Sequence, residues 1–295
     1  MRILLTGTSG QVGAALLPLL DRQGSVLAPK RDTLDLSRPE TLARALDAAR
    51  PELIVNPAAY TAVDRAEDER ELAFRVNAEA PAVMAGWAAQ HGVPMVHFST
   101  DYVFDGSGTA PWREDSEPNP LSVYGASKLA GDRAIIAAAP VHLIVRTSWV
   151  YAARGINFLN TIIRLAKERE ELRVVADQIG APTSARVIAE AVAELVRTAG
   201  PDLGWGLRQR GNILNVACSD ETSWHGFATA IVEGARARGM ALKCERILPI
   251  RTKEFPTRAK RPANSRLSTR RIVETFGIAP LPWRDALARE LADVP

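Results

Sequence analysis

The chain opens with RILLTGTSGQVGAALLPLL, residues 2–20, in which an apolar run, a glycine-rich turn and an amphipathic run follow one another directly. Gly7, Gly10 and Gly13 have the spacing GxxGxxG. Glycines at such a turn let the backbone approach a ligand closely, and the N-terminal amides of the next helix can hold a pyrophosphate. The alternative to a phosphate-binding loop is a glycine turn with a purely structural role. We interpret the stretch as a strand, loop and helix that bind a dinucleotide.

Apolar runs and amphipathic stretches alternate through the first half of the chain. Runs such as LIVN (53–56), MVHFST (95–100) and HLIVRT (142–147) lack polar alternation, which is typical of parallel strands buried on both faces. Helical stretches between them suit right-handed crossovers. The sequence therefore predicts an α/β fold: a Rossmann-type doubly wound parallel sheet, with a smaller, partly interwoven C-terminal substrate lobe.

The pattern becomes less regular after Tyr151, and we expect the two parts of the chain to interweave there. An NAD(P)-binding domain is expected at 1–150 plus roughly 211–236, where NILNVA predicts a further strand. A sugar-nucleotide substrate domain is expected at roughly 151–210 and 237–295. A loop rich in Gly and Trp, residues 201–211, leads into the further strand.

The composition excludes several classes of protein. With 46% hydrophobic and 24% charged residues, the chain is an ordinary soluble globular protein. It has no apolar run of about 18 residues and no cleavable signal, so we expect a cytoplasmic protein without a membrane partner. Cys218 and Cys244 lack CxxC spacing, and the four histidines lack HExxH spacing. We therefore predict interior thiols and no metal site.

Positive charge is concentrated near the C-terminus. The segment 246–271 holds nine Lys or Arg residues against one acid, Glu254, a net charge of +8; because the whole chain carries +3, the remainder carries −5. This segment has three alternative interpretations: a solvated face, a nucleic-acid patch, or a pocket for a phosphorylated small molecule. The segment has a single aromatic residue, Phe255, which disfavours single-strand binding, and we predict no nucleic-acid partner.

Tyr124 and Lys128 lie four residues apart in SVYGASKLAGD, a spacing that puts both side chains on one face of a helix. The chain has only 4 tyrosines and 6 lysines, and no other tyrosine has a lysine at this offset, so a chance pairing is a poor explanation. Ser99 and Thr100 end a predicted strand upstream of this helix. We predict that Tyr124 and Lys128 handle a proton.

This combination resembles the extended short-chain dehydrogenase/reductase superfamily, which joins a GxxGxxG loop to Tyr-x-x-x-Lys and an upstream Ser or Thr. STDYVFDG, PLSVYGASKLAGD, RTSWVYA, DQIGAPTSA and KRPANSRLST resemble, more specifically, the dTDP-4-dehydrorhamnose reductase family, from Met1 to about Leu291. The resemblance implies reduction of the C4 keto group of dTDP-4-dehydro-L-rhamnose (dTDP-6-deoxy-L-lyxo-4-hexulose) by NAD(P)H. This reaction is the last step of dTDP-L-rhamnose synthesis for cell-surface polysaccharide.

The resemblance also implies roles for individual residues. The catalytic residues would be Tyr124, Lys128 and Thr100. The coenzyme would contact Gly7, Gly10, Gln11, Val12, Gly13, Lys30, Arg31, Asp35, Leu36, Ala58, Ala59, Tyr60, Thr61, Phe98, Tyr124 and Lys128. The dTDP-sugar would contact Thr100, Asp101, Tyr124, Trp149, Arg261 and Arg266. A core aromatic remains the alternative for Trp149, and a solvated face the alternative for the two arginines.

Other functions remain open at this stage. The 4,6-dehydratases of this fold place Asp-Glu after the catalytic Thr, whereas this chain has Asp101 and Tyr102, which favours plain reduction. A non-catalytic NADP-binding subunit resembling the regulatory β subunit of methionine adenosyltransferase is one rival. A reductase or epimerase for another nucleotide sugar is a second, because the residues that bind the base cannot be identified from the sequence.

Oligomeric state and Mg²⁺ are also open. Some members of the family form a Mg²⁺-linked dimer that needs acids near the first helix and the C-terminus. Ala14 and Ala15 stand where an acid is expected, which argues against such a dimer. The chain is expected to be a monomer or a homodimer.

The coenzyme preference is predicted from SVLAPKRDTLDL, residues 25–36. An NAD-dependent enzyme normally has an Asp or Glu about 20 residues past the glycine loop, to accept hydrogen bonds from the ribose 2′-hydroxyl. Lys30 and Arg31 occupy this place, with Asp32 just beyond. Because a lysine and an arginine would pair with a 2′-phosphate, we expect NADPH to be preferred and NADH to be accepted.

Overall fold

The computed structural model describes residues 1–138, 141–199 and 212–294. Within these residues, six parallel strands form a central sheet in the order β10-β5-β4-β3-β1-β2. Its strands are β1 (Arg2–Leu5), β2 (Ser25–Leu27), β3 (Leu53–Asn56), β4 (Met95–Thr100), β5 (His142–Thr147) and β10 (Ile213–Asn215). Their carboxyl ends meet at one edge, with Thr100 opposite Thr147 in the register. The predicted doubly wound parallel sheet is confirmed.

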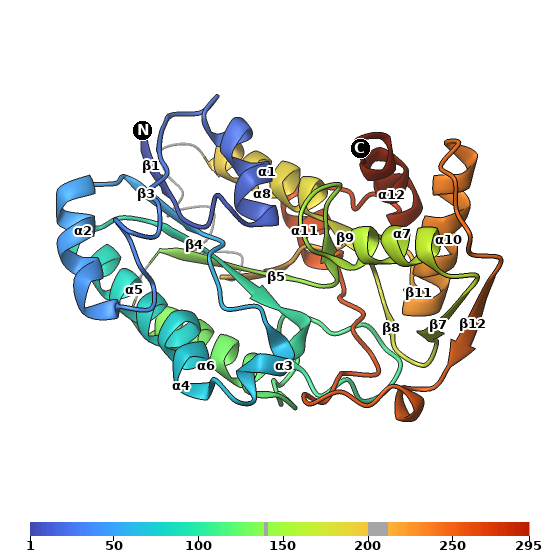
Figure 1. Cartoon of the computed structure of the whole chain (residues 1–295). Helices are drawn as coiled ribbons and strands as arrows, with labels where there is room; N and C mark the ends of the chain where they lie inside the picture. Colours follow the sequence, from blue (N-terminus) through green and yellow to red (C-terminus); the bar gives the residue numbers. More distant parts are fainter. Residues whose placement is uncertain (139–140, 200–211, 295) are drawn as a thin grey trace.

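Helices cover both faces of this sheet (Figure 1). One face packs on α1 (Gln11–Leu20), α8 (Ala185–Ala199) and α11 (Arg270–Phe276). The other face packs on α2 (Leu42–Ala49), α5 (Ala80–His91) and α6 (Val123–Ala138). Strands β1, β3, β4 and β5 are buried except at Arg2, and their apolar residues pack against both helical layers, as the continuous runs in the sequence indicated.

Short segments connect the second helical layer to the strand ends. They are the 3₁₀ segments η1 (Pro39–Thr41) and η3 (Asp101–Val103), the helices α3 (Val63–Ala66) and α4 (Arg70–Phe74), and the π-helical segment η2 (Arg75–Glu79). Residues 70–91 are helical throughout, but they do not form one continuous α-helix. The π-helical turn separates α4 from α5 and buries Asn77 against α6.

A second core forms the smaller lobe, seen around the labels α7, α10 and α12 in Figure 1. It contains α7 (Phe158–Glu168), α10 (Trp224–Ala237), α12 (Trp283–Ala292) and the parallel pair β7 (Glu171–Val175) and β12 (Arg246–Ile250). The remaining segments are β6 (Val150–Tyr151), which pairs with β9 (Thr183–Ser184), β8 (Ile179–Gly180), which pairs with β11 (Thr222–Ser223), and η5 (Thr252–Glu254).

Two helices pack against a different core from the one that the expected domain boundaries assign to them. Helix α8 was expected in the substrate lobe, but its apolar side packs on α1 and the sheet. Helix α10 was expected with the sheet, but Phe227 and Ile231 lie in the second core. Both helices are amphipathic, so their own patterns do not determine which core each one covers. The loop expected at 201–211 lies outside the described residues.

Both cysteines are buried free thiols, as predicted. None of the helices in the described ranges is both long enough and apolar enough to cross a bilayer.

Candidate active site

The glycine loop joins β1 to α1 at the carboxyl edge of the sheet. Gly7 has φ +60°, a left-handed conformation that favours glycine, and a Cβ there would lie 2.9 Å from the backbone of Ala58. A Cβ on Gly13 would lie 2.1 Å from the carbonyl oxygen of Gly7. Helix α1 begins after Gly10 without a side-chain cap and has no acid in its first turn. The first amides of α1 are therefore free to bind a phosphate, and the loop fits a dinucleotide.

Gln11 and Val12, the other candidates in this loop, begin α1. The side-chain oxygen of Gln11 accepts a hydrogen bond of 3.0 Å from Asn157 at the start of α7, so the loop is tied to the smaller lobe. Val12 packs against the core of the sheet.

Lys30 and Arg31 follow β2 and are both exposed. The Nε of Arg31 lies 3.4 Å from Oδ1 of Asp35. Burial would raise the pKa of Asp35, but hydrogen bonds from Ser37 and the charge of Arg31 hold that pKa below its usual range. Leu36 is buried in the second helical layer. Both cations are therefore at the surface, and Arg31 lies beside the carboxylate of Asp35.

Ala58, Ala59, Tyr60 and Thr61 form the loop after β3. Asn77 holds this loop, because its Oδ1 accepts from the Tyr60 amide at 2.8 Å and its Nδ2 donates to the Tyr60 carbonyl at 3.0 Å. The same Nδ2 lies 3.0 Å from Ser127 Oγ, which donates to the carbonyl of Tyr124 at 2.8 Å. The chain of hydrogen bonds fixes this loop relative to the start of α6.

The three candidate catalytic residues converge at the carboxyl end of β4. Thr100 ends the strand, while Tyr124 and Lys128 occupy successive turns of α6, so the predicted shared helical face is confirmed. Tyr124 is 9% exposed and Lys128 is 2% exposed. Tyr124 shares a side-chain hydrogen bond with Thr100, which in turn donates to Oδ1 of Asp101 at 3.1 Å. Phe98, two residues before Thr100, packs in the core of the sheet.

Burial dominates the electrostatics of this cluster. It raises the pKa of the Tyr124 phenol, and the contact with Thr100 opposes that rise. Burial lowers the pKa of the Lys128 amine to about 8, against the attraction of Asp132. It also raises the pKa of Asp101 to about 6, although the hydroxyls of Ser265 and Thr100 favour the carboxylate. Three groups with shifted pKa values at one strand end are typical of a reactive site.

Two buried partners of Lys128 were missed in the sequence. Nζ of Lys128 lies 3.1 Å from Nε2 of His97 on β4. Asp132, one turn further along α6, accepts from Ser99 at 2.7 Å and lies 3.9 Å from Arg146. The signal for Asp132 was its i,i+4 spacing from Lys128, whereas nothing local pointed to His97.

Trp149 has φ +49°, an uncommon conformation for a bulky residue. Its ring stacks on Trp224 with centroids 3.6 Å apart. Gly180 packs closely between the Trp149 ring and Ser265. A Cβ added to Gly180 would lie 2.8 Å from the ring of Trp149 and 3.1 Å from Cβ of Ser265. Since Ser265 also contacts Asp101, Trp149 lies in the neighbourhood of the Tyr124 cluster. Strained backbone held by close packing is common at functional sites.

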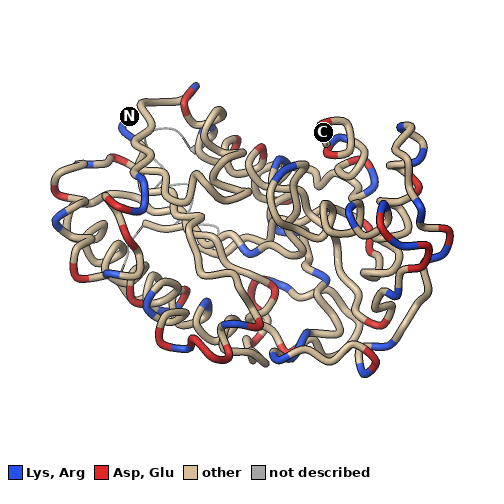
Figure 2. The backbone as a smooth tube through the Cα atoms, in the orientation of Figure 1, with Lys and Arg blue, Asp and Glu red and all other residues tan. Residues whose placement is uncertain are grey.

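The basic segment 246–271 is largely paired with acids from elsewhere in the chain. Arg261 Nη2 lies 2.6 Å from Asp64 on α3, and Arg266 forms an ion pair with Glu221. Further pairs are Arg246–Glu171, Arg258–Asp68, Arg270–Glu274 and Arg271–Glu114. Figure 2 shows acidic and basic segments interspersed along the tube. The sum of +8 therefore overstates the free positive charge of the segment.

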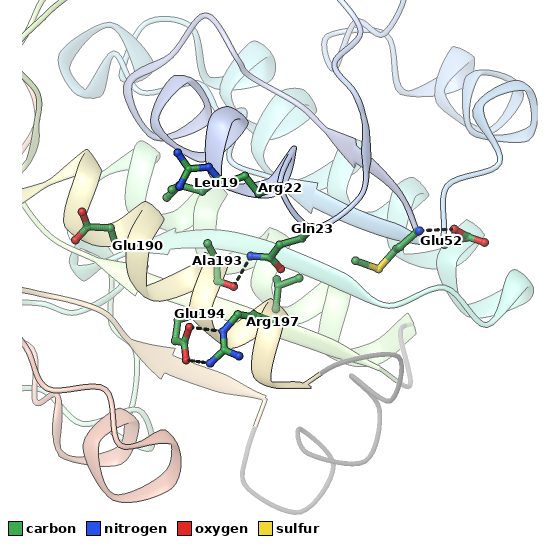
Figure 3. A pocket seen from close by; sticks show the side chains of 10 residues that line it. Leu19, Arg22, Gln23, Glu52, Glu190, Ala193, Glu194 and Arg197 are labelled. Atoms are coloured by element: carbon green, nitrogen blue, oxygen red, sulfur yellow. Dashed lines mark hydrogen bonds and ion pairs between the residues drawn. The ribbon is translucent and has the colours of Figure 1, made fainter.

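A hollow of about 1000 Å³ opens at another place, beside α1 and the C-terminal half of α8 (Figure 3). Met1 and Glu52, which line it, precede β1 and β3, so it lies at the amino ends of the strands. Several of its other polar residues pair with neighbours, as Gln23 does with Ala193 and Arg197 with Glu194. Ligands of open α/β sheets bind at the opposite, carboxyl edge. We therefore assign the candidate active site to the Tyr124 cluster.

Comparison with known proteins gives full-length matches. The family model described as RmlD substrate binding domain matches residues 1–295. A dTDP-4-dehydrorhamnose reductase from Burkholderia thailandensis is 48% identical over 100% of this chain and 99% of its own. The crystal structure of a dTDP-4-dehydrorhamnose reductase from Clostridium acetobutylicum superposes with a TM-score of 0.90, at 33% identity and 99% coverage of both chains. A Bacillus anthracis reductase of the same name, solved in complex with NADP, gives a TM-score of 0.89 at 34% identity and 99% coverage of both.

Proposed function

This chain belongs to the dTDP-4-dehydrorhamnose reductase family, and we propose that it reduces the C4 keto group of dTDP-4-dehydro-L-rhamnose with NAD(P)H to give dTDP-L-rhamnose. The observation that carries the proposal is the convergence of Thr100, Tyr124 and Lys128 at the edge of the sheet where the glycine loop opens. A phenol, an amine and a hydroxyl in this arrangement suit proton delivery to a carbonyl oxygen.

The proton would come from Tyr124. The phenol of Tyr124 would give its proton to the ketone oxygen, while C4 would take the hydride that a bound NAD(P)H would supply, so the carbonyl would become an alcohol. Burial raises the pKa of this phenol, which keeps it protonated and also makes it a weak acid. The ammonium form of Lys128 would stabilise the phenolate that remains. Thr100 would orient the ketone oxygen by a hydrogen bond.

The coenzyme would be held by the glycine loop and by the ends of β2 and β3. Gly7, Gly10 and Gly13 leave the first amides of α1 free for its pyrophosphate. Lys30 and Arg31 would bind a 2′-phosphate, so we propose a preference for NADPH. The complex of the Bacillus anthracis relative with NADP supports this choice.

The nucleotide sugar would lie between the sheet edge and the smaller lobe. Asp101 and Trp149 are candidates for the sugar, and Arg261 and Arg266 for the diphosphate. Since each arginine is already paired with an acid, the diphosphate would have to share or replace Asp64 and Glu221. We propose that the core formed by α7, α10 and α12 is the substrate lobe.

The test is turnover by the purified chain with NADPH and dTDP-4-dehydro-L-rhamnose, followed by NADPH absorbance and by identification of the sugar product. We expect one dTDP-L-rhamnose for each NADPH oxidised. A regulatory subunit would bind NADPH without oxidising it. An enzyme for another nucleotide sugar would give a higher kcat/KM with the corresponding UDP- or GDP-linked keto sugar, so these substrates belong in the same assay.

A further inference from the structure

A chain of buried polar side chains leads from the end of β1 to Lys128. The hydroxyl of Thr6 donates to Oδ1 of Asn56 at 2.6 Å. Nδ2 of Asn56 lies 3.1 Å from Nδ1 of His97, and Nε2 of His97 lies 3.1 Å from Nζ of Lys128. Thr6, Asn56, His97 and Lys128 are each no more than 2% exposed. They come from β3, β4, α6 and the residue that follows β1.

The direction of this hydrogen-bond chain is set at Thr6. Its hydroxyl oxygen accepts from the amide of Ala58 at 3.2 Å, so its single proton is available for Asn56 Oδ1. With the Asn56 amide reversed, the Thr6 oxygen would receive two N–H groups, and its own proton would lose the acceptor at 2.6 Å. The arrangement therefore has Asn56 Nδ2 donating to His97 Nδ1.

The tautomer of His97 follows from this direction. Because Nδ1 accepts, the proton of the neutral ring is on Nε2, the nitrogen that faces Lys128. Burial lowers the pKa of His97 well below its usual value, so the ring is neutral at physiological pH. An ammonium group has only donors, and the Nε2–H of His97 offers it no acceptor. The contact suits a neutral Lys128 amine, which can accept from Nε2.

Other ionisable groups around Lys128 come from several elements. Tyr124 and Asp132 are on α6, Arg146 is on β5, and Asp101 begins η3. Asp132 attracts the ammonium form: its Oδ2 accepts from Ser99 and lies 3.9 Å from Nε of Arg146, whereas its Oδ1 has no hydrogen-bond partner among the described residues. Burial outweighs this attraction and lowers the pKa of Lys128 to about 8, so the amine is mostly neutral above that pH.

We propose that His97 is a positioning residue that, with its proton fixed on Nε2 by Asn56 and Thr6, holds Lys128 largely as a neutral amine in the coenzyme-free protein at alkaline pH, so that coenzyme binding takes up a proton there. The bound coenzyme would bring hydroxyl oxygens, the acceptors that an ammonium needs. The proton goes from solvent to Nζ of Lys128. The inference rests on the proposed function, because it gives Lys128 the cationic form that the reduction requires only once the coenzyme is in place.

The experiment is calorimetric titration of NADPH into the protein at pH 8.5, in buffers of different ionisation enthalpy. At this pH the 2′-phosphate of NADPH is fully ionised in both states, since its second pKa is about 6, and contributes no proton. We expect an uptake of more than about half a proton for each NADPH bound. His97→Gln presents an amide oxygen to Lys128, so Lys128 is already an ammonium group before NADPH binds. Proton uptake should therefore fall toward zero, while NADPH still binds.

Asn56→Asp is the second variant. Its carboxylate would accept from Nδ1–H, leave Nε2 as an acceptor for the ammonium group, and reduce the uptake in the same way. If circular dichroism shows that His97→Gln does not fold, Asn56→Asp is used for the test instead. An uptake below about a tenth of a proton in the wild type, or a wild-type uptake in both folded variants, overturns the proposal. Uptake without any turnover of the sugar would refute the proposed function and leave this inference intact.

Discussion

Arg261 and Asp64 stand 197 positions apart in the chain, and Nη2 of the arginine lies 2.6 Å from Oδ2 of the aspartate. The backbone amide of Ala259 donates to Oδ1 of the same aspartate at 3.1 Å. Asp64 therefore ties the C-terminal basic segment to α3. Within the described part of the chain, Nη1 of Arg261 is buried without a hydrogen-bond partner, so the guanidinium retains a donor for a ligand.

The diphosphate hypothesis predicts a selective effect of Arg266→Ala. Forked, charge-assisted hydrogen bonds from arginine to phosphate contribute roughly 1.5–3 kcal/mol each, so KM for the nucleotide sugar should rise about tenfold or more. KM for NADPH should change by less than about twofold, since the change leaves the glycine loop intact. Steady-state kinetics with each substrate varied in turn measures both. Arg270→Ala, in an exposed pair of the same segment, is the control and should change neither. Equal small effects of Arg266→Ala on the two KM values would contradict the hypothesis.

Tyr124→Phe should lower kcat by about 10² to 10⁴, the usual contribution of general acid catalysis, because the proton donor is lost. The ring and its edge contact with Tyr102 remain, so the Kd for NADPH should stay within about twofold, as measured by fluorescence titration. Tyr151→Phe makes the same change in the smaller lobe, at a buried hydroxyl without a partner among the described residues, and should retain turnover. A near-normal kcat for Tyr124→Phe would mean that another group supplies the proton.

Asp101 is predicted to reduce stability at neutral pH. Burial raises its pKa to about 6, above the ordinary value of 3.8, so the folded state binds its proton more tightly than the unfolded state does. The cost of ionising it is absent below about pH 4, grows up to about pH 6, and is fully present above that. Asp101→Asn keeps an acceptor for Thr100 and should raise the free energy of unfolding by about 1–2 kcal/mol at pH 8 and not at pH 4.

Urea denaturation of wild type and variant at the two pH values measures this difference. Asp105→Asn is a control of opposite sign. Hydrogen bonds from the Ser107 hydroxyl and amide and from Asn119 hold the pKa of Asp105 below its usual value. Its stabilising contribution is present at pH 8 and lost as pH falls, so this variant should be less stable than wild type at pH 8. A lower stability of Asp101→Asn at pH 8 would show that its carboxylate is better solvated than the burial indicates.

The coenzyme preference is predicted to depend on Lys30 and Arg31. We expect the wild type to have a higher kcat/KM with NADPH than with NADH. Lys30→Asp combined with Arg31→Ala should lower that ratio by about tenfold or more, because both cations that can pair with the 2′-phosphate are removed. Arg38→Ala, which removes a more distant exposed arginine paired with Glu40, should leave the ratio unchanged. If the wild type favours NADH, or the double change has no effect on the ratio, these residues do not recognise the phosphate.

The sequence by itself determined the features that repeat over a few residues. The apolar runs identified the buried strands, the glycine spacing identified the turn before α1, and the helical period put Tyr124 and Lys128 on one face. Each of these depends on backbone geometry within one element, so local residue order contains the information. The fold class and the proposed catalytic trio were predictable for this reason.

Only the tertiary structure decided which distant residues meet. Helices α8 and α10 are both amphipathic, and the packing of whole elements assigned them to different cores. The same packing brought His97 to Lys128, and brought acids from α3 and from the loop before β11 to the arginines of a segment that carries +8 by composition. Hydrogen bonds and ion pairs between distant residues depend on three-dimensional proximity and burial, which the local order of residues does not encode.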